Sequence, residues 1–248
     1  MPDAAPLLEL EGLDAGYRGV PVVRGLDLHV APGEVVALLG PNGAGKTTTL
    51  STIAGLLAPV GGAVRLSGQE VGGRPAHRLA RDGVSLVPEG RSLFFGLTVA
   101  EHLKLARTKG SLADKELLEL LPELEKCLGR KAGVLSGGEQ QMLAVGRALV
   151  SRPKLLLVDE MSLGLAPVIV ERLLPILRRV AVELGAGVLF VEQHVALALR
   201  LADRAYVLSH GRLALEGPAA DLRGRPELLR SSYLGDAVAT PQPQGAGL

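Results

Sequence analysis

Short apolar segments alternate with longer stretches of helical periodicity along the 248 residues of the chain. Apolar runs of about four to eight residues bounded by Gly, Pro or Asp are typical of strands, and apolar residues spaced three and four apart are typical of helices. The pattern predicts strands at Leu7–Leu13, Val22–Val30, Glu34–Leu39, Ala63–Ser67, Val84–Val87, Leu155–Val158, Val188–Val191, Tyr206–Ser209 and Arg212–Glu216. It predicts helices from Gly45 to about Leu56 and at Pro75–Asp82, Thr98–Ala106, Asp114–Leu121, Gly137–Val150 and Pro167–Leu184.

The alternation of strands and helices predicts an α/β fold, with helices on both faces of a parallel sheet. The stretch from about 98 to 150 differs, because its pattern is helical throughout. We interpret it as a helical insertion between two parts of an α/β core, 7–97 and 151–223. Pro175 lies inside the last long helix and should kink it or mark a junction. The Pro-, Gln- and Gly-rich tail 236–248 is expected to be disordered.

Composition and charge exclude several classes of protein. The formal net charge is +1, so the electrostatics of the whole chain gives no support for binding nucleic acid or anionic membranes. The single cysteine, Cys127, excludes an intrachain disulfide and is expected to be a small apolar residue on a helix. There is no signal-peptide pattern at the N-terminus and no apolar run approaching the roughly 18–20 residues that span a bilayer. We expect a cytoplasmic protein that reaches a membrane only through partners.

A glycine-rich turn follows the third predicted strand and opens a helix. Its backbone N–H groups and the helix N-terminus would point at phosphate oxygens. Lys46 would supply charge to the β- and γ-phosphates, and the Thr47 hydroxyl would ligate Mg²⁺. The turn predicts a nucleoside-triphosphate site without choosing among GTPases, kinases and ATPases. It fits the pattern G-x-x-x-x-G-K-[ST] and comprises Gly40, Pro41, Asn42, Gly43, Ala44, Gly45, Lys46, Thr47 and Thr48.

A second helix start, at Leu135–Gln141, combines a serine cap with two glycines. Ser136 caps the helix, and Glu139 lies in the first turn, as a capping box requires. Gly137 and Gly138 leave backbone N–H groups exposed, which makes a second phosphate site. The two phosphate sites are far apart in the sequence, so the fold or a partner has to bring them together.

The sequence LSGGEQQ at Leu135–Gln141 resembles the signature motif of the nucleotide-binding subunits of ABC transporters, and the resemblance covers about residues 7–235. It implies one ATPase domain with a P-loop NTPase core, a parallel sheet, a small antiparallel β part and an inserted helical subdomain. It also implies that two subunits pack head to tail. Ser136, Gly137 and Gly138 of one chain would then close on the γ-phosphate of the ATP held by the other.

The resemblance also assigns roles to two adjacent acids. Asp159 and Glu160 follow the apolar strand Leu155–Val158, where two acids taken alone would be an ordinary strand end. In ABC ATPases the residue matching Asp159 holds Mg²⁺ through water. The residue matching Glu160 polarises the attacking water as general base.

Three further residues match family positions. His194, after the strand Val188–Val191, matches the switch histidine that contacts the γ-phosphate and orients the water. Tyr17 matches the aromatic residue that stacks on adenine. Glu89 stands where most ABC ATPases have a glutamine that senses Mg²⁺ and the membrane subunits. It is therefore expected to contact both the nucleotide and Mg²⁺.

Two residues depart from the family pattern. Met161 stands where the family usually has proline, and Leu165 where it commonly has aspartate. Leu165 ends the loop Ser162–Leu165, which matches the family's dimer-contact loop. Neither departure removes a phosphate or metal ligand, but both bear on the coupling between subunits.

Several segments resemble the shorter ATPase subunit of importers for branched-chain amino acids, although many members of that group carry Asn at the position of His194. This resemblance implies a second ATPase subunit, two permeases and an extracytoplasmic substrate-binding protein as partners, and a peripheral place on the inner face of the membrane. The segments are Glu89–Arg91, Leu97–Val99, Ser162–Pro167, Glu192–Gln193 and Ser232–Gly235.

Three alternatives differ from this reading of the function. The ATPase of a urea or short-chain amide importer is a close relative. An ABC ATPase of DNA repair or translation would usually have two cassettes or a long coiled-coil insertion, and this chain has neither. A module that binds ATP without hydrolysing it would be favoured by loss of Lys46 or Glu160, and both are present.

Overall fold

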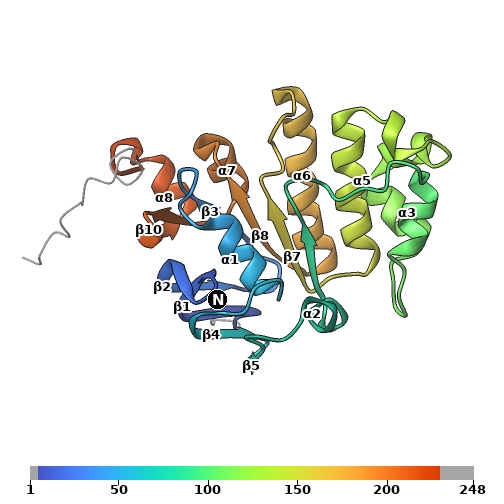
Figure 1. The fold of residues 1–248 in the computed structure, drawn as a ribbon. Coiled ribbons are helices and arrows are strands. Elements are labelled where there is room, and N and C mark those ends of the chain that lie inside the picture. Colours follow the sequence, from blue (N-terminus) through green and yellow to red (C-terminus); the bar gives the residue numbers. More distant parts are fainter. Residues whose placement is uncertain (1–4, 230–248) are drawn as a thin grey trace, which may run out of the picture.

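A six-stranded sheet forms the centre of the computed structural model, which describes residues 5–229 (Figure 1). Its strand order is β10-β9-β3-β8-β7-β6. The first five strands from the β6 end run parallel, and β10 pairs antiparallel with β9. The strands are β3 (Val35–Leu39), β6 (Val84–Val87), β7 (Leu155–Asp159), β8 (Gly187–Glu192), β9 (Arg204–Ser209) and β10 (Arg212–Pro218).

A second, antiparallel sheet of order β2-β1-β4-β5 packs below the first. Its strands are β1 (Leu8–Tyr17), β2 (Val20–Val30), β4 (Gly61–Leu66) and β5 (Gln69–Glu70). Buried and more exposed positions alternate along much of β2, as expected for a sheet with one covered face. This sheet is the small antiparallel part that the sequence predicted.

The strand β3 separates two hydrophobic clusters, because successive side chains of a strand point to opposite faces. Val35, Ala37 and Leu39 belong to a cluster shared with α6 and the helical stretch. Val36 and Leu38 belong to a cluster shared with the antiparallel sheet. The six-stranded sheet is therefore covered on both faces, which explains why its parallel strands are apolar throughout.

The regular structure within residues 98–150 is helical, apart from one isolated bridge between Thr98 and Lys131. Cys127 is buried on a 3₁₀ turn here, as a small apolar residue would be. In Figure 1, α6 (Pro167–Leu184) stands between this stretch and α1 (Lys46–Ile53). The stretch contains α3 (Val99–Leu105), α4 (Asp114–Leu120), 3₁₀ turns at Pro122–Cys127 and Ala132–Val134, and α5 (Gly137–Val150).

The predicted α/β class is confirmed, and the differences are local. The strand β1 extends to Tyr17, past the predicted end at Leu13, because it pairs with β2 to the end of the hairpin. α6 is a single helix through Pro175, so this proline marks no junction. Three short helices complete the set: α2 (Ala76–Asp82), which was predicted, and α7 (Val195–Leu201) and α8 (Ala219–Arg223), which were not.

Two sequence predictions fall outside the described residues, namely the segment Ser232–Gly235 and the disordered tail 236–248. Within residues 5–229, no helix is both long enough and apolar enough to cross a membrane.

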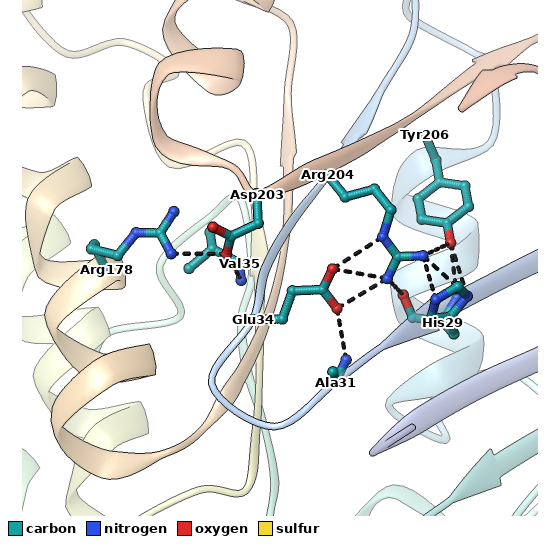
Figure 2. Close-up of polar contacts among 8 residues, drawn as sticks. All are labelled: His29, Ala31, Glu34, Val35, Arg178, Asp203, Arg204 and Tyr206. Carbon is teal, nitrogen blue, oxygen red and sulfur yellow. Dashed lines mark hydrogen bonds and ion pairs between the residues drawn. The ribbon is translucent and has the colours of Figure 1, made fainter. Parts of the chain in front are cut away.

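A hydrogen-bond network joins the turn between β2 and β3 to β9 (Figure 2). Arg204 donates from Nε and Nη2 to Glu34 Oε1 at 3.0 and 2.9 Å. Glu34 Oε2 accepts from Ala31 N at 2.7 Å, which closes the turn. Arg204 Nη1 donates to the Tyr206 hydroxyl at 2.7 Å. The Arg204–Glu34 ion pair thus connects the start of β3 to the neighbouring strand β9. β3 is the strand that leads to the glycine-rich turn.

Arg204→Ala should lower the free energy of unfolding by about 2–3 kcal/mol, because it leaves the largely buried Glu34 carboxylate without its partner. The Arg204 and Glu34 side chains are 19% and 16% exposed. Urea denaturation followed by circular dichroism measures the change. The control is Lys115→Ala, since the side chains of its pair with Glu119 are 88% and 64% exposed and such pairs contribute little. Equal stability losses in the two variants would contradict the prediction.

Candidate functional site

The carboxyl ends of three parallel strands meet at one edge of the sheet. Leu39 of β3 is in register with Glu192 of β8, and Val191 of β8 is in register with Asp159 of β7. The residues that follow these strands are therefore neighbours in space, although they are far apart in the sequence. Ligands of open α/β sheets bind outside this edge.

The glycine-rich turn begins directly after β3, and two of its glycines are required by close backbone or side-chain neighbours. Gly45 precedes α1 with φ +102°, and a Cβ there would lie 2.2 Å from Val23 Cγ2. A Cβ on Gly40, with φ +152°, would lie 2.4 Å from Leu208 O. Any other residue at these positions would push the turn out of its shape.

Lys46 is a buried cation at the first position of α1, only 4% exposed. Its Nζ donates to Gly40 O at 2.9 Å and Pro41 O at 3.0 Å. It also lies 3.7 Å from Glu160 Oε1. Burial lowers the pKa of Lys46, and the negative charges of Glu160 and Asp159 oppose this change. The turn thus holds a charged ammonium group against its own carbonyls, at the N-terminus of a helix.

Thr47 and Asp159 supply oxygen atoms beside this ammonium group. Thr47 Oγ1 donates to Asp159 Oδ1 at 3.2 Å. Burial raises the pKa of Asp159 to about 6. Mg²⁺ in proteins is usually bound by one or two side-chain oxygens, and phosphates and water complete its coordination. The Thr47 hydroxyl and the Asp159 carboxylate therefore fit this ion. Residues 5–229 contain no cluster of three or more His, Cys, Asp or Glu side chains that would bind a metal without such help.

Glu160 lies at the same edge and is held through both its side chain and its backbone. Its Oε2 accepts from Gln193 Nε2 at 2.7 Å, and its backbone N donates to Val191 O at 3.1 Å. Its φ is +42°, a left-handed conformation that costs a non-glycine residue about 1–3 kcal/mol. Such strain persists where surrounding contacts hold it and is common at functional sites.

These groups surround a cavity of about 360 Å³. Asp159 does not line the cavity but accepts a hydrogen bond from Thr47, which does. Gly40 and Pro41 accept from Lys46 Nζ, and Ala44 N donates to Pro41 O. The structure therefore brings together most of the predicted nucleotide and metal residues. The lining comprises Val22, Asn42, Gly43, Gly45, Lys46, Thr47, Thr48, Glu89, Glu160, Leu163 and Gln193.

The predicted adenine-stacking and switch residues, Tyr17 and His194, also lie outside this lining. Tyr17 ends β1 and is 51% exposed, which is a position for an aromatic residue to stack on a ligand from solvent. His194 precedes α7 and is exposed, and the neighbouring Gln193 contacts Glu160 in its place. Their proposed roles in stacking and in orienting water are thus carried by the family resemblance alone.

The predicted second phosphate site, at Ser136, Gly137 and Gly138, is not part of the cavity lining. Ser136 caps α5, and Glu139 Oε2 accepts from Ser136 N at 2.7 Å. This bond, above all, lowers the pKa of Glu139 to about 2. A Cβ on Gly138 would lie 2.7 Å from Ile169 Cγ2, so glycine lets α6 pack there. Neither Ser136 nor the two glycines, Gly137 and Gly138, line the cavity, so one chain does not join its two phosphate sites.

The loop 88–97 links the cavity to α5. Glu89 lines the cavity, and its negative charge contributes to the raised pKa of Asp159. Arg91 donates from Nε to Gln141 Oε1 at 3.0 Å and from Nη1 to Gln140 Oε1 at 2.8 Å. A displacement of this loop would therefore reach the helix that carries the second phosphate site.

Four residues that line the cavity or hold its neighbours have no predicted contact there: Arg91, Leu163, Glu192 and Gln193, although Leu163 lies in the predicted dimer-contact loop. The segments Glu89–Arg91 and Glu192–Gln193 were marked in the sequence only for their resemblance to the importer subunit. Parallel pairing places Glu192 and Gln193 beside Glu160, and that pairing could not be derived from the residues themselves.

Comparison with known proteins decides the family. A family model described as ABC transporter matches residues 23–162. The high-affinity branched-chain amino acid transport ATP-binding protein BraG of Pseudomonas aeruginosa is 42% identical over 237 residues, which cover 92% of this chain and 100% of BraG. This chain belongs to the ABC transporter family.

Two further comparisons agree with this assignment. The lipopolysaccharide export system ATP-binding protein LptB of Acidithiobacillus ferridurans is 34% identical, over 93% of this chain and 97% of LptB. A solved ATP-binding subunit of an ABC transporter is 32% identical, with a TM-score of 0.78 over 92% of this chain and 98% of that structure. As a member of this family the chain is an ATPase.

Lys46→Ala should lower the affinity for ATP at least about tenfold, because it removes a buried cation and its charge-assisted hydrogen bonds to phosphate. Isothermal titration calorimetry measures the affinity. Lys104→Ala in α3 makes the same change of charge on an exposed side chain and should leave the affinity unaltered. Unchanged ATP binding by the Lys46 variant would remove this residue from the site.

Proposed function

We propose that this ABC ATPase powers an importer, most specifically one for branched-chain amino acids, and that it works as a head-to-tail dimer with two ATP at the interface. The ATPase domain would span 7–235, with a core of 7–97 and 151–223 and a helical subdomain of about 98–150. The observation that carries the mechanism is the convergence of Lys46, Thr47 and Glu160 on one cavity beside the buried Asp159.

In the proposed reaction, Lys46 exchanges the carbonyls of Gly40 and Pro41 for phosphate oxygens, which bind an ammonium group more strongly. Thr47 and Asp159 would hold Mg²⁺, which would supply positive charge to offset the negative charge that develops on the phosphate during transfer. Glu160 would accept a proton from the attacking water. The bond from Gln193 keeps the Glu160 carboxylate directed toward the cavity.

The separation of the two phosphate sites supports a dimer. The glycines after Ser136 are outside the cavity of their own chain, yet their helix start carries backbone N–H groups suited to phosphate. A second chain in head-to-tail orientation would supply this helix start to the open side of the cavity. We expect an isolated chain to turn over slowly and its activity to rise with concentration.

A basic groove beside the free edge of β6 supports a docking place for a permease. The groove has a volume of about 1080 Å³. Its lining contains several cations and one acid, Asp82, which forms an ion pair with Arg74. The exposed Phe94 and Phe95 lie on the adjoining loop 88–97. A helix carrying acidic and apolar residues would complement this surface. The cations are Arg74, Arg81, Lys109, Arg147, Arg152 and Lys154, and His77 also lines the groove.

The substrate assignment depends on similarity to BraG, because the proposed site would bind nucleotide and would not contact the transported substrate. BraG covers the chain with higher identity than LptB does, which favours amino-acid import over lipopolysaccharide export. The proposed partners are a second ATPase subunit, two permeases and, through them, an extracytoplasmic substrate-binding protein. The chain would then lie on the cytoplasmic face of the membrane. Loss of leucine uptake in cells lacking this subunit would support the assignment, and normal leucine uptake with loss of another substrate would overturn it.

Glu160→Gln should retain ATP affinity within about twofold and lower the rate of hydrolysis at least about 100-fold, because the amide does not accept the proton from water. Gel filtration with ATP should show a stable dimer, since the nucleotide remains intact. Phosphate release measured at saturating ATP tests the rate. Hydrolysis near the wild-type rate would show that Glu160 is not the base.

Arg91→Ala should reduce the stimulation of ATP hydrolysis by permease subunits about tenfold while leaving ATP affinity unchanged, because it cuts the bonds from the loop 88–97 to Gln140 and Gln141. Hydrolysis is compared with and without permease in proteoliposomes. Arg225→Ala removes an exposed positive charge elsewhere and serves as control. If both variants were stimulated as strongly as the wild type, the loop would not transmit docking through Arg91.

A further inference from the structure

Glu192 is a carboxylate buried at the centre of the site edge, with 1% of its surface exposed. Its Oε1 accepts from the backbone N of Ser162 at 3.0 Å, and its Oε2 accepts from Ser162 Oγ at 2.5 Å. Both carboxylate oxygens are therefore directed at one residue of the segment that follows β7. Glu192 does not line the nucleotide cavity.

Ser162 is the centre of a tight turn that begins at Glu160. Leu163 N donates to Glu160 O at 3.2 Å, and Leu165 N donates to Ser162 O at 3.1 Å. The turn leaves Leu163 half exposed at the cavity and brings Leu165 against the second phosphate site, where a Cβ on Gly137 would lie 3.4 Å from Leu165 Cδ2. This turn therefore contacts both the cavity and the start of α5.

Glu160 has the least relaxed backbone in this turn, because its φ of +42° is in the left-handed region. Three contacts from the end of β8 hold the segment: Val191 O accepts from Glu160 N, Gln193 Nε2 donates to Glu160 Oε2, and Glu192 accepts twice from Ser162. The Glu192 contacts are the only ones of the three that hold the turn downstream of Glu160. Without them, Glu160 would be free to relax its backbone.

We propose that Glu192 is a positioning residue, which holds Glu160 in its strained conformation and the turn Glu160–Leu165 in contact with the cavity and the second phosphate site. The inference rests on the proposed role of Glu160 as general base. Glu192 does not line the cavity, and both of its carboxylate oxygens accept hydrogen bonds from Ser162.

The test compares three single variants by ATP turnover and by calorimetric ATP affinity. Glu192→Ala should lower kcat about 100-fold with KM and ATP affinity within about twofold, because a shift of the base by about 1 Å costs that much. Glu192→Gln should restore kcat to within about fivefold, since its amide oxygen accepts from Ser162 N and its Nε2 donates to Ser162 Oγ. Ser162→Ala keeps the backbone bond and should lower kcat about tenfold.

A double-variant cycle supplies the matched control. Ser162→Ala should have little further effect in the Glu192→Ala background, because the two side chains form one contact. Thermal melting verifies that each variant is folded. If Glu192→Ala does not fold, the same cycle is run with Glu192→Gln. The kcat values of Glu192→Gln, Ser162→Ala and the double variant then show whether the two side chains act through one contact.

Three outcomes overturn the proposal. A wild-type kcat in Glu192→Ala would show that the turn keeps its place unaided. Glu192→Gln as inactive as Glu160→Gln would show that Glu192 takes part in proton transfer. A loss of ATP affinity that matches the loss of rate would show a role in binding. Failure of the proposed function differs from all three, because the wild-type protein would then hydrolyse ATP without dependence on Glu160.

Discussion

The register of the parallel strands decides where the glycine-rich turn and the acids of the candidate site lie. β3, β8 and β7 end together, so the glycine-rich turn, the polar residues after β8 and the acids after β7 project from one edge of the sheet. Each strand is buried on both faces, and a slip of one residue would expose an apolar set to water. Hydrophobic burial thereby positions the chemistry to within hydrogen-bond distance, although no apolar side chain takes part in it.

The charges at this edge are unusually buried, and each is held by neutral or opposite partners. Lys46 donates to two carbonyls, Asp159 accepts from Thr47, and Glu192 accepts from Ser162. A buried charge without such bonds would cost several kcal/mol. Burial still raises the pKa values of Asp159 and Glu192, so the site contains negative charge that a cation or a positive neighbour would stabilise. The arrangement suits a ligand that arrives with Mg²⁺.

The proposed site needs two chains, and connections within one chain would link its parts. The loop 88–97 reaches α5 through Arg91, and the turn after Glu160 reaches the start of α5 through Leu165. The helix start that would complete a partner's site thus contacts both the loop beside the basic groove and the turn beside the base. Docking, hydrolysis and dimer closure would then share one set of contacts.

The sequence by itself determined the α/β class, the helical stretch and the residues of the glycine-rich turn, because these follow from local periodicity and from a contiguous pattern of glycines around Lys46. It also named Asp159 and Glu160, which end one apolar strand. Only the tertiary structure decided that Gln193 holds Glu160, that Glu192 holds Ser162 and that Arg91 holds α5. These contacts join residues 30 to 50 positions apart. Their partners are brought together by strand pairing and helix packing, which no local pattern of residues records.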